Sequence, residues 1–120
     1  MTNEKIDKHS LKTLKPLVGR LMAYEARQIL IDSGKHNPRA RNFAVRYAVP
    51  PEEIKKRIIE IFRNNSYEIP DTELLKDMSL EYLDEMMGFA TANPSYSKLK
   101  KRILTGKYDF LSALEINACS

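Results

Sequence analysis

Apolar residues recur at steps of three and four along most of this chain, with charged residues between them. The first such stretch follows Thr13, which can cap a helix, and it places Pro16 in the first turn. Ser33-Gly34 would close this helix. Its apolar side would hold Leu14, Leu17, Val18, Leu21, Met22, Ile29 and Leu30. The pattern predicts an amphipathic helix over residues 13–33.

Two shorter helices are predicted on either side of Pro50-Pro51. Asn37-Pro38 can open the first, which must end before the prolines because proline cannot continue a helix. The second begins on the prolines and carries Glu52 and Glu53 in its first turn, where the helix dipole favours acidic side chains. It ends at residues 64–66, and its buried stripe would be Ile54, Ile58, Ile61 and Phe62.

The C-terminal half predicts further short helices. One covers residues 71–77, and Ser79 can cap the next, which carries Leu80, Leu83, Met86, Met87 and Ala90. A basic helix over residues 95–104 is stopped by Gly106, and Asp109 can cap a last helix.

No segment alternates between apolar and polar residues for long enough to predict a strand. The fold class is therefore all-α, an orthogonal bundle of six or seven short helices with a helix-turn-helix-like corner at residues 38–64. A chain of 120 residues predicts a single helical domain over residues 1–120. Its polar residues 1–10 are expected to be flexible.

Charge is distributed unevenly along the chain, whose net charge is +4. Residues 1–66 hold 14 Lys and Arg against 7 Asp and Glu, residues 67–92 hold 1 against 7, and residues 93–120 hold 5 against 2. A basic, an acidic and a second basic block indicate that a polyanion can meet one side and a basic or apolar protein another. Alternatively, these charges only pair with one another on solvated helix faces.

The corner at residues 38–64 carries the spacing of a helix-turn-helix. Its small and apolar positions are Ala44, Ala48, Val49, Ile54 and Ile58. The second helix would point Lys55, Lys56 and Arg57 outward, while basic residues before it would hold phosphates. The predicted nucleic-acid-binding residues are therefore Arg39, Arg41, Arg46, Lys55, Lys56 and Arg57.

Two features favour a different interpretation of the same corner. Glu52 and Glu53 would lie at the end that enters the groove and would repel phosphates, although glutamate can accept from cytosine N4. Ala48 lacks the conformational freedom of a turn glycine. The alternative is a helical corner that only contributes to the core.

A second candidate surface is the acidic stretch over residues 71–92, which contains Glu81, Asp84, Met86 and Met87. Methionine adapts to irregular partner surfaces, so this face could bind a protein, or it could simply be core.

The tail between Tyr96 and Tyr108 interleaves basic residues with two tyrosines. It could clamp a phosphate backbone or a single strand, unless those tyrosines are core residues.

Catalytic constellations are missing from the sequence. His9 and His36 lack a second ligand at helical spacing, and Cys119 is the single cysteine, so neither a metal nor a disulfide is expected. No glycine belongs to a phosphate-cradling loop. We expect no enzyme and no cofactor.

The polar start and the short apolar runs predict no membrane span and a cytoplasmic location.

The sequence therefore predicts a non-enzymatic binding protein. The most concrete hypothesis is a small DNA-binding protein for transcription regulation, with duplex nucleic acid as partner and a homodimer suited to two half-sites. The alternative is an adaptor, chaperone or inhibitor that binds a protein through the acidic, methionine-containing helix at residues 71–92.

Overall fold

The structure is a computed structural model that describes residues 6–33, 50–89 and 94–115. These residues form five helices and no strand, so the all-α fold class is confirmed for them. The helices are α1 (Lys8–Asp32), α3 (Pro51–Asn64), α4 (Thr72–Met87), α5 (Pro94–Leu104) and α6 (Phe110–Ala113). The predicted helix over residues 38–48 lies outside the described residues, and the orthogonal arrangement stays a prediction.

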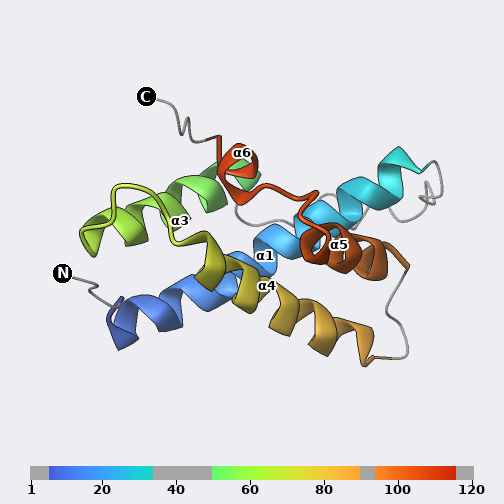
Figure 1. Cartoon of the computed structure of the whole chain (residues 1–120), viewed down its shortest axis with the longest axis horizontal. Coiled ribbons are helices and arrows are strands. Elements are labelled where there is room, and N and C mark those ends of the chain that lie inside the picture. The colour runs from blue at the N-terminus through green and yellow to red at the C-terminus, as the bar shows by residue number, and fades with distance from the viewer. Residues whose placement is uncertain (1–5, 34–49, 90–93, 116–120) are drawn as a thin grey trace.

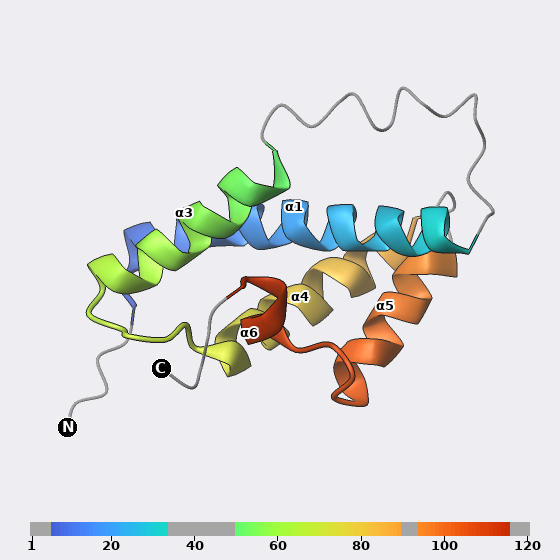
Figure 2. The ribbon, with the colours of Figure 1, turned by 90° about the horizontal axis from the view of Figure 1, so that it is seen from above.

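The long helix α1 is the element on which the others assemble (Figure 1). Helices α3, α4 and α5 each contact α1, α4 also contacts α5, and α6 contacts α4. Viewed from above, α3 runs back along the first half of α1, whereas α5 lies at its second half (Figure 2). Residues from all five helices form one core, which includes Leu14, Met22, Ile58, Leu83 and Phe110.

Helix α1 begins five residues earlier than residues 13–33 predicted. Asp7 caps it by accepting a hydrogen bond from the Ser10 N–H at 2.8 Å. Ile6 and Leu11 occupy the two positions of a hydrophobic staple, and both pack against the core. Residues 8–10 are therefore helical, and of the segment expected to be flexible only residues 1–5 lie outside the described residues.

Two residues assigned to the start of this helix lie in its interior instead. The Thr13 hydroxyl donates back to the His9 carbonyl at 3.1 Å, as threonine does within a helix. Pro16 is also inside α1. It is exposed, and because proline has no N–H, it cannot donate to the Lys12 carbonyl.

Helix α4 is continuous where two helices were predicted, over residues 71–77 and from Ser79 onward. Asp71 caps α4 by accepting from the backbone N–H groups of Glu73 and Leu74. Ser79 is fully buried, and its hydroxyl donates to the Leu75 carbonyl at 2.7 Å within the same helix. A serine that hydrogen-bonds backward in this way does not start a new helix.

Other boundaries agree with the prediction, except that α4 ends at Met87, before the predicted Ala90, and α6 is a single turn that ends at Ala113. Helix α3 begins on Pro51, with Glu52 and Glu53 in its first turn, and ends at Asn64. Gly106, with a φ of 76°, follows α5, and Asp109 caps α6 through the Leu111 N–H at 3.0 Å.

Helices α1 and α4 approach each other closely at Gly19. A Cβ atom at this position would lie 3.1 Å from the ring of Tyr82. Gly19 is buried, so the absence of its side chain creates the space in which the Tyr82 ring packs.

Candidate nucleic-acid interface

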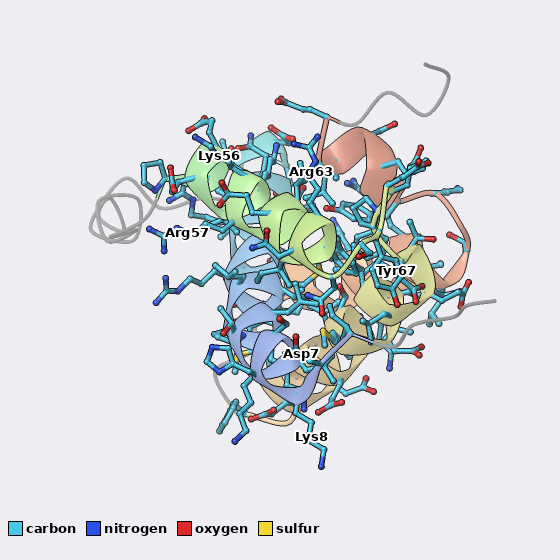
Figure 3. The ribbon with its side chains drawn as sticks, turned by 90° about the vertical axis from the view of Figure 1, so that its left-hand side faces the viewer. Asp7, Lys8, Lys56, Arg57, Arg63 and Tyr67 are labelled. Atoms are coloured by element: carbon cyan, nitrogen blue, oxygen red, sulfur yellow. The ribbon has the colours of Figure 1, made fainter. Side chains whose placement is uncertain are left out.

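Helix α3 has one attached side and one open side. Among the described helices it contacts α1 alone. Of the predicted stripe, Ile54, Ile58 and Phe62 are buried, whereas Ile61 is half-buried. Tyr67 follows the helix and packs edge-on against Phe62, with ring centroids 5.6 Å apart. Ile59 and Ile61 beside this stripe are half-buried, and the remaining side carries charged side chains, which Figure 3 shows at Lys56, Arg57 and Arg63.

The three basic residues predicted on α3 differ in their surroundings. Lys56 and Arg57 are exposed, whereas Lys55 is half-buried. The Arg57 Nε atom donates to Glu53 Oε2 at 3.2 Å. The positive charge of Lys55 favours the ionised form of the Glu25 carboxyl on α1. This lysine therefore interacts with a partly buried group as well as with solvent.

Arg39, Arg41 and Arg46 lie outside the described residues, as do Ala44, Ala48 and Val49. The described part of the helix-turn-helix-like corner is therefore its second helix. The turn and the first helix of this corner stay predictions.

Acidic side chains share the open side of α3. Glu52 and Glu60 are exposed and lie on one helical stripe with Lys56 and Arg63, because the spacing of these positions is four, four and three residues. With Glu53, which pairs with Arg57, the cations Lys56, Arg57 and Arg63 are balanced by three carboxylates of α3. Glu115, which follows α6, also lines a pocket with Lys56 and Arg63. Glu52, which the sequence identified as an obstacle to phosphate, does lie on the solvent side.

A second basic surface lies on α5 and the turn after it. Lys98, Lys101, Arg102 and Lys107 are exposed, and no acidic residue occurs between Pro94 and Tyr108. Lys100 is partly shielded by its ion pair with Asp84 of α4. This surface is more uniformly basic than α3, but α5 packs against both α1 and α4.

The two tyrosines of this region belong to the core and not to a stacking platform. Tyr96 and Tyr108 are half-buried and pack against the core residues. The Tyr108 ring also meets Phe110 edge-on, with centroids 4.9 Å apart. Aromatic faces packed in this way do not lie open for bases.

Glu25 projects from α1 into a partly buried environment between three elements. Burial raises its pKa, while Tyr108, Lys55 and Arg102 oppose that rise. Burial and the neighbouring Glu25 charge in turn raise the pKa of Tyr108. The Tyr108 hydroxyl is buried without a partner of good hydrogen-bond geometry among the described residues, so the carboxyl acts on it chiefly as a nearby charge.

The acidic, methionine-containing face of α4 is only partly open. Glu81 and Asp84 are exposed; Glu81 lies 3.9 Å from Lys15, and Asp84 pairs with Lys100. Met86 is half-buried, whereas Met87 is 38% exposed. Phe89, which the sequence did not single out, is 55% exposed just after the helix. Met87 and Phe89 form the apolar end of α4.

Metal-ligand groups of three or more His, Cys, Asp or Glu are absent from the described part of the chain. Of the described helices, none combines the length and the apolar composition needed to cross a membrane.

No protein-family model, curated protein or solved structure matches the chain. Its function is therefore inferred from the charges and contacts of its own residues.

Proposed function

We propose that the protein binds duplex DNA, without catalysis, as a transcriptional regulator, and that α3 is the helix that faces the DNA. The observation that carries this proposal is the open side of α3. The helix contacts α1 alone among the described helices and leaves Lys56, Arg57 and Arg63 exposed. The major groove of B-DNA, about 12 Å wide, admits one helix that is not enclosed by neighbours.

Within this proposal the exposed cations supply phosphate contacts and the buried stripe holds the helix. Lys56, Arg57 and Arg63 would each neutralise a phosphate. Lys55 would contribute less, because it is half-buried and its charge acts on Glu25. Such contacts position the protein and bind most sequences alike, so base recognition would come from additional contacts in the groove.

The test is fluorescence anisotropy of a labelled random-sequence duplex at about 50 and about 200 mM salt. We compare the wild type with a variant that carries Lys56→Gln, Arg57→Gln and Arg63→Gln. Three phosphate contacts would make wild-type binding about 40-fold weaker at the higher salt concentration, and the variant should lose both the affinity and this dependence.

The matched control removes the same charge from α5, through Lys98→Gln, Lys101→Gln and Lys107→Gln. These residues are also exposed, so both variants should stay folded, which circular dichroism verifies. The control should keep wild-type binding. Equal losses in the two variants would mean that net charge alone attracts DNA, and no binding at the lower salt concentration would reject the proposal.

A dimer would strengthen such an interface, because two copies of α3 could reach half-sites about 34 Å apart. Light scattering of the protein with and without a duplex would measure the stoichiometry. A single copy per duplex would contradict this part of the proposal.

Protein binding is the second candidate, supported by the apolar end of α4. Met87 and Phe89 are among the large apolar residues that stay exposed, and the exposed Asp84 and Glu85 lie beside them. A partner with apolar side chains and basic flanks would complement this end. Affinity capture with the wild type and a Met87→Gln, Phe89→Gln variant tests it. The same proteins captured by both would reject this candidate.

A further inference from the structure

A groove lies between α1 and α3, on the side of α3 next to its exposed cations. Its volume is about 380 Å³, and residues of both helices line it. Pro16, Leu17 and Ile61 supply apolar surface, whereas Arg20, Arg57 and Asn64 supply hydrogen-bond donors. Apolar walls with a few convergent polar groups are typical of ligand sites.

The two arginines come from different helices and line the same space. Arg20 is exposed on α1 and forms no ion pair or hydrogen bond with any described residue. Arg57 of α3 is bonded through Nε to Glu53, which leaves its two terminal nitrogens without a partner among the described residues. Figure 3 shows Arg57 on α3 beside the labelled Lys56. Two like charges at one groove attract an anion between them.

We propose that this groove binds a phosphate group between the guanidinium groups of Arg20 and Arg57. Guanidinium donors match phosphate oxygens in a planar, two-pronged geometry, and Pro16, Leu17 and Ile61 supply the apolar surface beside them. Glu53 is a positioning residue, because its bond to Nε fixes the Arg57 side chain. Asn64 can add a neutral donor.

Glu60 also lines the groove and limits its charge. It forms no ion pair with Arg20 or Arg57 within the described residues, so it reduces the attraction for an anion without neutralising either guanidinium directly. Glu53 already pairs with Arg57, so Arg20 is the arginine of the groove that has no acidic partner among the described residues. This fits a single phosphate rather than a cluster of them.

If the phosphate belongs to the DNA backbone, this inference rests on the proposed function. It adds Arg20, a residue outside the predicted corner, to the surface of α3. The same chemistry would also hold a free phosphate or a phosphate monoester, and the experiment separates these sources.

The first arm measures the slope of log K against log salt concentration for a labelled duplex. Arg20→Gln should lower the magnitude of the slope by at most about 0.9, because Arg57 still faces the phosphate that the two arginines share. Lys101→Gln, which removes one exposed charge from α5, should keep the wild-type slope. A wild-type slope in Arg20→Gln, with binding still dependent on Lys56 and Arg63, would overturn the inference and leave the proposed function intact.

The second arm applies if the wild type does not bind duplex, which would reject the proposed function alone. The Nε–Hε signals of Arg20 and Arg57 are then followed by NMR during titration with inorganic phosphate and a nucleoside monophosphate. Saturable shifts of both signals in the wild type, lost for Arg57 in Arg20→Gln, would support the groove. Signals that do not move would overturn the inference.

Discussion

Asn65 and Ser10 join the end of α3 to the start of α1. The Asn65 Nδ2 atom donates to Ser10 Oγ at 3.1 Å and to the Ile61 carbonyl at 2.7 Å, while Oδ1 accepts from the Asp7 N–H at 3.2 Å. The side-chain amide of Asn65 therefore bonds to the last turn of α3 and to two residues at the start of α1. Because α3 contacts no other described helix, this link fixes the direction in which its open side points.

We expect Asn65→Ala to destabilise the protein by about 2 kcal/mol, because it removes three hydrogen bonds and leaves the Asp7 N–H without its partner. Urea unfolding followed by circular dichroism measures the change. Asn64→Ala is the control, since Asn64 is exposed at the neighbouring position. Equal free energies of unfolding for the two variants would contradict the role given to Asn65.

Stability should depend on pH through Glu25. Burial raises its pKa in the folded protein, so its contribution is most favourable below its ordinary pKa and is lost as the pH rises through the raised value. Glu25→Gln removes the charge that burial penalises. We therefore expect this variant to gain stability relative to the wild type between about pH 4 and about pH 7.

The measurement is urea unfolding of both proteins at the two pH values. Glu60→Gln serves as control, because Glu60 is exposed, and its stability difference from the wild type should change less with pH. If Glu25→Gln became less stable than the wild type as the pH rose, then Lys55 and Arg102 would outweigh the burial of the carboxyl.

Ser79→Ala distinguishes a helix interior from a helix start. In the structure the Ser79 hydroxyl donates to a carbonyl of the same helix, so its loss leaves no new unsatisfied group, and alanine favours the helix. We expect a change within about 0.5 kcal/mol, whereas loss of a cap costs about 1 kcal/mol. Asp71→Ala, which does remove a cap, is the comparison in urea unfolding. Equal losses would argue for two helices.

Removing the acidic charge at Glu60 should strengthen DNA binding. Glu60 lies between Lys56 and Arg63 on the open side of α3 and also lines the groove with Arg20 and Arg57. Glu60→Gln removes repulsion from phosphates, so we expect about three- to tenfold tighter binding at low salt. Glu85→Gln removes the same charge from α4 and should have less effect in the anisotropy titration. An equal gain in both variants would contradict a local role.

Local signals in the sequence predicted much of the fold. Pro51 and Gly106 mark helix boundaries through their backbone properties, and Asp109 marks one through a side chain that accepts from the Leu111 N–H. Thr13 and Ser79 were wrong as caps because a hydroxyl also bonds backward inside a helix, and nothing local decides between the two. For Thr13 the outcome follows from Asp7, which caps α1, and from Ile6 and Leu11, which pack against the core at the start of this helix.

The candidate site was less accessible to prediction. Lys56 and Arg57 could be recognised as outward-facing from the spacing of the apolar stripe, and both are exposed. The interaction of Lys55 with the partly buried Glu25 carboxyl could not be predicted, because the two residues are 30 positions apart in the chain. Arg20 could not be predicted as a site residue, because exposed cations are common on amphipathic helices. Its place in the site follows only from α3, which brings Arg57 to the same groove.

The attachment of α3 to a single neighbour has a consequence for motion. Helices α1, α4 and α5 contact one another pairwise, so none of the three can open without disturbing the other two. Helix α3 can separate from α1 while that set of three stays assembled. Its backbone amides should then exchange with solvent through partial opening, at a lower free energy than the amides at the centre of α1. The position of the helix proposed to meet DNA would thus be less costly to adjust than that of α1, α4 or α5.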